Sequence, residues 1–192
     1  MVTNLASSVD AFTSNAFLVE GDRTVLVDPG ANFDITSAVR EHVDDLDAVL
    51  VTHPHPDHVG NLDDVKDAFG VDVWGFDASD DGVDHELADG DTVTIGDHEY
   101  EALHTPGHEP HHLVFYSREA SVLFAADLVF ANGAFGRTDL EGGDRDTLLR
   151  SIDRVLDALD ADLDVMHAGH GPSVTTGAVQ NIESAARAAR QR

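Results

Sequence analysis

The chain has 192 residues, of which 37 are aspartate or glutamate and 11 are lysine or arginine, so its formal net charge is −26. A field of this sign repels phosphate backbones and anionic lipid headgroups, which argues against nucleic-acid binding and against binding to membrane surfaces. The sequence has no cysteine, which excludes disulfides, thiolate metal sites and a cysteine nucleophile.

The length and the apolar content, 42% hydrophobic residues, predict one folded domain over residues 1–192. No apolar run approaches the ~20 residues of a membrane span and no leader-like segment opens the chain, so we expect a soluble, cytoplasmic protein. Most of the acids are aspartates, and Lys66 is the only lysine. Such acidity resembles that of proteins from salt-loving microbes, because at about 1 M salt the Debye length is only ~3 Å and the repulsion is screened.

The first half of the chain predicts a hairpin followed by alternating helices and strands. Two apolar runs, 16–20 and 24–27, flank Gly21-Asp22, which is a two-residue turn signal. Apolar residues at helical spacing predict helices, and short continuous apolar runs predict buried strands. The expected helices cover 34–43 and 62–69, the second closed by Gly70, and the expected strands cover 47–52 and 71–76.

The second half begins with residues 77–91, whose seven acids predict a solvated loop. Two hairpins are expected next, with strands at 92–95 and 98–104, then at 113–116 and 122–126. A glycine-rich segment, 133–144, precedes an amphipathic helix at 146–159, a strand at 163–166 and a closing helix at 175–190. The mixture predicts an α/β fold in which two mixed β-sheets pack face to face and are flanked by helices, a four-layer αββα sandwich.

The segment His53-Pro-His-Pro-Asp-His58 is the strongest functional signal, because random placement gives this spacing roughly 0.007 times in such a chain. It follows a predicted strand, and Pro54 and Pro56 are expected to prevent a continuing helix. In an extended loop His53 and His55 point the same way and can bind one cation. Asp57 and His58 emerge on the next turn and can bind another.

Three further segments place a histidine or aspartate just past an expected strand. They are Thr105-Pro-Gly-His108, Ala125-Ala-Asp127 and Ala168-Gly-His-Gly-Pro172, whose central residue is His170. Imidazole and carboxylate ligands without thiolates suit Zn²⁺, Fe²⁺ or Mn²⁺. A carboxylate that bridges two such ions holds them ~3.5–4 Å apart, a two-metal geometry for hydrolysis.

Together these residues resemble the metallo-β-lactamase superfamily over nearly the whole chain. The resemblance implies the metallo-β-lactamase fold and two divalent metal ions, with Zn²⁺ first and Fe²⁺ or Mn²⁺ as alternatives. It also implies that His53, His55 and His108 hold one ion, that Asp57, His58 and His170 hold the other, and that Asp127 bridges both.

Finer motifs resemble the small, single-domain type II glyoxalases, which are hydroxyacylglutathione hydrolases. They are Gly136-Arg-Thr-Asp139, Gly142-Gly-Asp144 and Gly169-His-Gly-Pro172. The longer glyoxalase II enzymes continue into a helical domain with basic residues that bind glutathione, and only about 22 residues follow His170 here. Enzymes of this fold that act as β-lactamases match poorly because their second site commonly uses a cysteine.

The resemblance implies hydrolysis of an S-lactoyl thioester to lactate and a thiol by a metal-bound hydroxide, which Asp57 would orient as the catalytic residue. Arg137 is a candidate for binding a substrate carboxylate, although a structural ion pair explains it equally well. His111 and His112, which follow the Thr-Pro-Gly-His turn, either support metal ligands or are ordinary strand residues.

Two other functions stay open on the sequence. A persulfide dioxygenase would use His53, His108 and Asp127 around a single iron, and a lactone or other ester hydrolase would keep the whole motif. In each case we expect a small-molecule substrate, no nucleic-acid or membrane partner, and a possible homodimer.

Overall fold

The computed structural model describes residues 1–159 and 163–191 and contains two compact units, each with its own β-sheet. The first unit comprises Met1–Leu87 and Thr94–His98, and the second comprises Ala88–Val93 and the described residues from Glu99 onward. The expectation of a single domain stays a prediction.

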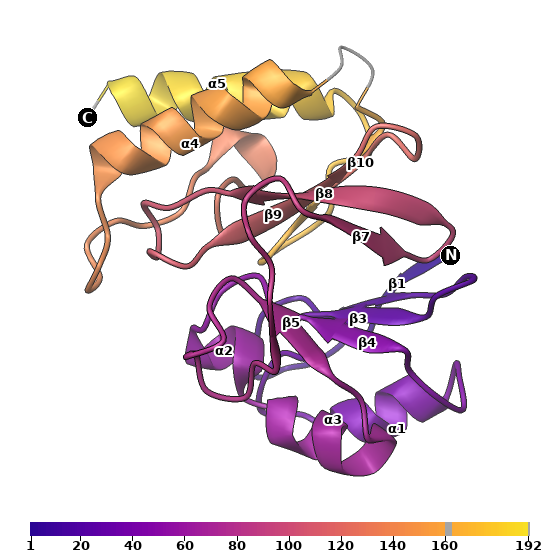
Figure 1. Ribbon diagram of the computed structural model, residues 1–192. Helices are drawn as coiled ribbons and strands as arrows, with labels where there is room; N and C mark the ends of the chain where they lie inside the picture. The colour runs from indigo at the N-terminus through magenta and orange to yellow at the C-terminus, as the bar shows by residue number, and fades with distance from the viewer. Residues whose placement is uncertain (160–162, 192) are drawn as a thin grey trace. The chain divides into compact units, whose positions relative to one another are not determined.

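The first unit contains a six-stranded mixed sheet with the strand order β1-β2-β3-β4-β5-β6 (Figure 1). Strands β1 to β3 pair antiparallel and β3 to β6 pair parallel. The elements of this unit are β1 (Val2–Asn4), β2 (Phe17–Val19), β3 (Val25–Val27), α1 (Ile35–Arg40), β4 (Ala48–Leu50), α2 (Pro56–Val59), α3 (Leu62–Phe69), β5 (Val73–Gly75) and β6 (His85–Glu86).

Helices α1 and α3 cover one face of this sheet because their apolar positions recur on one side. Asp34 caps α1 by accepting a hydrogen bond from the backbone N–H of Ser37 at 3.0 Å. Gly70 ends α3 in the left-handed conformation at φ +63°, as the sequence predicted. The buried side chains of this core come from both helices and four of the strands, and include Leu18, Leu26, Ile35, Val39, Val49, Leu62, Val65 and Val73.

The second sheet has five strands in the order β11-β10-β9-β8-β7 and is also mixed, because β10 pairs parallel with β11 and antiparallel with β9. Its elements are β7 (Thr92–Ile95), β8 (His98–His104), β9 (Leu113–Ser117), β10 (Val122–Ala126), the 3₁₀ turn η1 (Ala131–Gly133), α4 (Arg145–Ala158), β11 (Val165–Ala168) and α5 (Ala178–Arg190).

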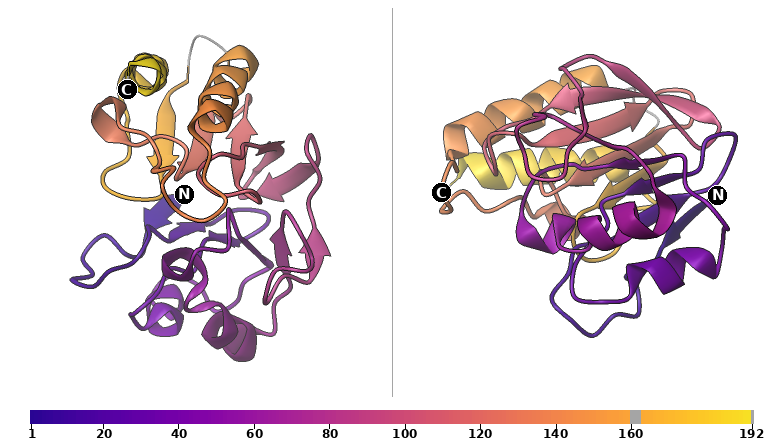
Figure 2. Two further views of the ribbon diagram at one scale, coloured as in Figure 1. Left: turned by 90° about the vertical axis from the view of Figure 1, so that its left-hand side faces the viewer. Right: turned by 60° about the horizontal axis from the view of Figure 1, so that its bottom comes forward.

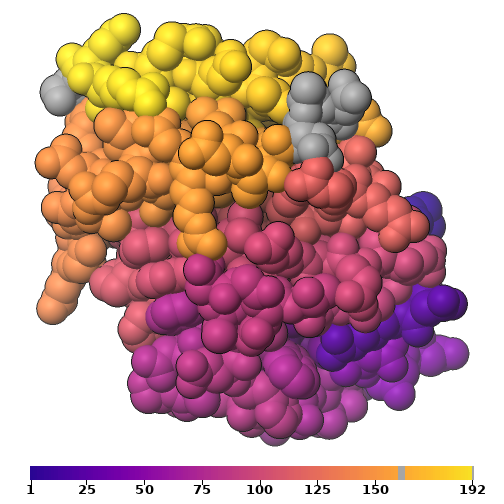
Figure 3. Space-filling model, turned by 45° about the horizontal axis from the view of Figure 1, so that its top comes forward, coloured from indigo at the N-terminus to yellow at the C-terminus, as the bar shows by residue number. Residues whose placement is uncertain are grey.

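Helices α4 and α5 lie side by side over this sheet (Figure 2) and form one continuous surface in the space-filling view (Figure 3). Asp144 caps α4 by accepting from the N–H of Thr147 at 2.7 Å. The Arg145 guanidinium donates to the carbonyl of Ala189 at 2.8 and 2.9 Å, which ties the start of α4 to the end of α5. Among the described residues, every helix is too short or too polar to cross a bilayer.

The expected fold class, an α/β fold with two mixed β-sheets flanked by helices, is confirmed, and several boundaries differ from those expected. Residues 77–91 are not entirely loop, because His85–Glu86 pair with β5 as strand β6. The last strand lies two residues later than the expected 163–166, and the last helix begins at Ala178. Strand β1 was not predicted, since its three residues show no clear alternation.

His167 on β11 makes the stability of the folded chain depend on pH. Its ring stacks on Phe124 and shares a hydrogen bond with the Ser173 hydroxyl at 2.8 Å, and burial lowers its pKa to about 4. The unfolded chain therefore binds a proton near pH 6.5 that the folded chain does not bind, so stability falls as the pH drops from 6.5 towards 4.

We expect the free energy of unfolding to fall by about 2 kcal/mol more between pH 8 and pH 5 in the wild type than in His167→Gln. Urea unfolding at each pH measures the difference. The matched control is His42→Gln, at an exposed position, which should keep the wild-type slope. Equal slopes for wild type and His167→Gln would contradict the prediction.

Candidate metal centre

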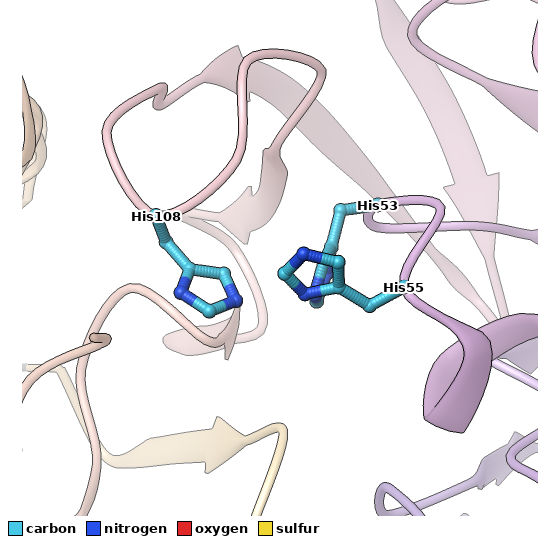
Figure 4. Close-up of side chains that lie close together, drawn as sticks. All are labelled: His53, His55 and His108. Carbon is cyan, nitrogen blue, oxygen red and sulfur yellow. The ribbon is translucent and has the colours of Figure 1, made fainter. Parts of the chain in front are cut away.

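In the first unit, the histidine motif follows strand β4 as an extended loop that enters a short helix. Thr52 and His53 are buried. The rings of His53 and His55 meet edge to face with centroids 4.6 Å apart, and Nε2 of His53 lies 3.0 Å from Nδ1 of His55 (Figure 4). The expected common direction of these two side chains is confirmed within this unit.

The helix α2 corrects the expectation that the prolines would keep this segment free of helix. Pro56 occupies the first helical turn, where its missing N–H and fixed φ cost nothing. His55 is the extended residue before the helix, and its carbonyl accepts from the N–H of His58 at 2.9 Å. The turn buries the His58 ring, while Asp57 lies half-buried on the same helix.

Asp28 directly follows strand β3 and was not among the predicted site residues. Its buried carboxylate accepts from the N–H of Thr52 at 2.8 Å, from the Thr52 hydroxyl at 2.7 Å and from Nδ1 of His58 at 2.7 Å. Because Nδ1 of His58 faces this carboxylate, Nε2 is the nitrogen that would ligate a metal. A carboxylate behind a ligating histidine fixes the orientation of its ring and raises its basicity.

In the second unit, strand ends and turns bring His108, Asp127 and His170 together. Oδ2 of Asp127 lies 3.5 Å from Nε2 of His108 and 3.6 Å from Nε2 of His170. His108 and Asp127 are buried, whereas the His170 side chain is one-third exposed. One carboxylate oxygen of Asp127 therefore lies within 3.6 Å of two imidazole nitrogens.

His112 supports Asp127 from behind. The N–H of Asp127 donates to Nε2 of His112 at 3.2 Å, and Nδ1 of His112 lies 2.8 Å from the Thr105 hydroxyl. Because Nε2 accepts, the ring proton is on Nδ1 and is directed to Thr105. Of the two readings left open for His112, the supporting role is the one this geometry favours. His111 is half-buried, and its backbone N–H donates to a carboxylate oxygen of Glu109.

Arg137 contributes through its backbone, since its carbonyl accepts from Nδ1 of His108 at 2.8 Å. Its guanidinium pairs with both oxygens of Asp139 at 2.8 Å, and the hydrogen bond from Arg137 lowers the pKa of Asp139 to about 2. Both side chains are mostly exposed, so this ion pair adds little to stability. Arg137 as a substrate-binding residue stays a prediction.

Gly136, next to Arg137, lies directly against the carbonyl oxygen of Asp127. A Cβ added at position 136 would overlap that oxygen and would also approach Cβ of His108. Glycine is therefore required here by the close approach of two backbone segments, and the approach keeps the Arg137 carbonyl in place to accept from His108.

The donor chemistry of both units fits a divalent cation. Their imidazole and carboxylate side chains belong to groups that could hold a metal ion. The separations of 3.5 and 3.6 Å in the second unit are long for hydrogen bonds. Two ligands held at 2.0–2.1 Å from one tetrahedral ion would themselves lie about 3.3 Å apart. The separations between Asp127 and the two histidines are therefore close to those of ligands that share an ion.

An α/β fold with two mixed sheets that carries histidines and aspartates past the ends of its strands is typical of the metallo-hydrolase superfamily. Residues 9–170 match the family model described as the metallo-beta-lactamase superfamily. The chain belongs to this superfamily.

Three relatives illustrate the range of similar proteins. The chain is 34% identical to hydroxyacylglutathione hydrolase GloC of Haemophilus influenzae, over 88% of this chain and 91% of that protein. A crystal structure described as BLEG-1 B3 metallo-beta-lactamase is 30% identical, with a TM-score of 0.77 over 92% of this chain and 95% of that one. A structure of TTHA1623 in a di-iron-bound form is 29% identical, with a TM-score of 0.74 over the same shares.

Proposed function

We propose that the protein hydrolyses thioesters of the glyoxalase II type, converting an S-lactoyl thiol into lactate and the free thiol. The observation that carries the proposal is the 34% identity to the Haemophilus influenzae hydroxyacylglutathione hydrolase across nine-tenths of that protein. The small-domain motifs around Arg137 and His170 support the same choice.

We propose that the two sets of side chains act on one pair of metal ions. His53, His55 and His108 would hold the first ion, and Asp57, His58 and His170 the second, with Asp127 shared. When bound, such ions lower the pKa of a water molecule and polarise the substrate carbonyl. Zn²⁺ is the first choice, and the di-iron relative makes iron the next to test.

The chain's own groups supply the rest of the reaction. The Asp57 carboxylate would accept a hydrogen bond from the attacking water and hold it towards the carbonyl carbon. Asp28 and His112 would keep their ligands oriented from behind, through His58 and the Asp127 N–H. A thiol has a pKa near 8.5, so the thiolate leaves without a proton and no separate acid is required.

The test is metal analysis of protein purified in high salt, followed by assays with S-lactoyl thioesters of glutathione and of N-acetylcysteamine. We expect about two metal ions per chain and hydrolysis of at least one thioester. Protein with its full metal content that hydrolyses neither would overturn the proposal. One iron per chain with oxygen uptake on a persulfide would instead establish the dioxygenase alternative.

Other substrate classes are included in the same assay. The relative described as a B3 metallo-beta-lactamase makes a β-lactam such as nitrocefin a specific second candidate, although the sequence motifs argued against that class. A lactone is the third. A cytoplasmic location and a homodimer stay proposals, which cell fractionation and light scattering would test.

We also propose that the acidic surface is adapted to high salt. Mutual repulsion within a net charge of −26 acts over about 10 Å at 0.1 M salt and ~3 Å at 1 M. We therefore expect the melting temperature to rise steadily between 0.1 and 2 M KCl in calorimetric scans. A flat or falling melting temperature over this range would refute the adaptation.

A further inference from the structure

The first unit contains a hollow beside the half-buried Asp57. The proposed reaction gives this hollow no role. Its volume is about 400 Å³, which lies in the range of small-ligand sites. We call it the Phe12 hollow. Its lining residues are Phe12, Ala31, Asn32, Pro56, Asp57 and Gly60.

Phe12 is unusual because its side chain is 76% exposed while the backbone around it is held in place. Its carbonyl accepts from Nδ2 of Asn32 at 2.8 Å. The next residue, Thr13, accepts from the N–H of Ala31 at 2.8 Å through its hydroxyl. Ser14 then donates its N–H to the carbonyl of Asp57 at 3.0 Å. The segment that carries Phe12 is thus hydrogen-bonded to the two lining segments that contain Asn32 and Asp57.

The lining selects for an uncharged, apolar group. Phe12, Ala31 and Pro56 provide carbon surface, and Asn32 is the neutral polar residue. Among the described residues of the lining, Asp57 alone is charged and none is basic. An anionic thiol carrier would meet a carboxylate there and a chain of net charge −26, so it is disfavoured in this hollow.

We propose that the Phe12 hollow binds the acyl chain of the thioester and that Phe12 sets the preference for acyl length. The inference rests on the proposed function, because it needs Asp57 beside the carbonyl that is attacked. The acyl chain is bonded directly to that carbonyl carbon, so it would extend from Asp57 along the Phe12 ring.

The experiment compares S-acyl-N-acetylcysteamine thioesters from acetyl to hexanoyl. In wild-type enzyme we expect kcat/KM to rise two- to fourfold per added methylene, because each buried methylene is removed from water. In Phe12→Ala the increase should fall below about 1.5-fold per methylene, so the loss of kcat/KM should be larger for the hexanoyl than for the acetyl thioester. Phe12→Leu should recover most of the length dependence, and Val2→Ala, which trims a partly exposed apolar side chain on β1, should keep all of it.

A second arm keeps the acetyl group and lengthens the alkyl chain of the thiol. If Phe12→Ala changes only this series, the hollow binds the thiol and the acyl assignment is wrong.

A third arm measures binding of hexanamide by saturation-transfer NMR, with and without metal, where Phe12→Ala should weaken the signal at least threefold. If the wild type hydrolyses the thioesters and the dependence on acyl length is unchanged in Phe12→Ala, the inference is overturned and the proposed function stands. Metal-loaded wild type that hydrolyses no thioester overturns the proposed function and the inference with it.

Discussion

Asp57→Asn is expected to lower kcat/KM for the preferred thioester by 10²–10⁴-fold, the usual contribution of a group that manages the proton of an attacking water. The amide keeps the size of the side chain, but it has one acceptor oxygen instead of two and carries no charge. Because Asp57 is only half-buried on the short helix α2, the melting temperature of the Asp57→Asn variant should stay within about 2 °C of wild type. Steady-state kinetics with parallel metal analysis and calorimetry measure these quantities.

The matched control is Asp67→Asn, which removes one carboxylate from an exposed position of α3. It changes the net charge by the same amount and should leave kcat/KM within twofold. If Asp57→Asn retains more than a tenth of wild-type activity with its metal content intact, Asp57 does not orient the nucleophile.

Asp28→Ala is expected to lower the free energy of unfolding by about 3–5 kcal/mol, because the change leaves three buried donors without their acceptor. Those donors are the N–H and hydroxyl of Thr52 and Nδ1 of His58. Asp28 also has a φ of +53°, where alanine is strained. Metal affinity should fall 10–100-fold as the His58 ring loses its orienting partner.

Asp28→Asn separates these contributions, since asparagine tolerates positive φ and keeps one acceptor oxygen. We expect it to lose about half as much stability as Asp28→Ala. Denaturant unfolding and metal titration of both variants provide the measurements. A loss below 1 kcal/mol in Asp28→Ala would show that this carboxylate does not hold the ligand loop.

The parts of the fold that the sequence predicted are those whose pattern is long or clearly punctuated. Helix α3 and strands β7 and β8 have the predicted bounds, because apolar periodicity and the glycines at 70 and 96 agree. Strand β6 was not visible, since two residues among acids are held by backbone pairing with β5 rather than by burial. Helix α2 was not expected because proline was taken as a helix breaker, although it is favoured in a first turn.

For the candidate site, the ligating residue types were visible in the sequence and their supports were not. His53 to His58 stand out by spacing alone, whereas Asp28 belongs to none of the histidine and aspartate motifs. Its role depends on a left-handed backbone and on a partner 30 residues away, which no local pattern encodes. His112 was noticed but could not be assigned, because only the fold places its Nε2 against the Asp127 N–H.

The contact between Gly136 and the Asp127 carbonyl has a practical consequence for anyone who randomises this enzyme to change what it cleaves. In a saturation library, position 136 will tolerate almost no replacement, and its profile will look like that of a residue that touches substrate. The intolerance would come instead from two main-chain segments that leave no room for a methyl group. A library can therefore leave codon 136 unchanged and randomise exposed positions nearby, such as Leu140.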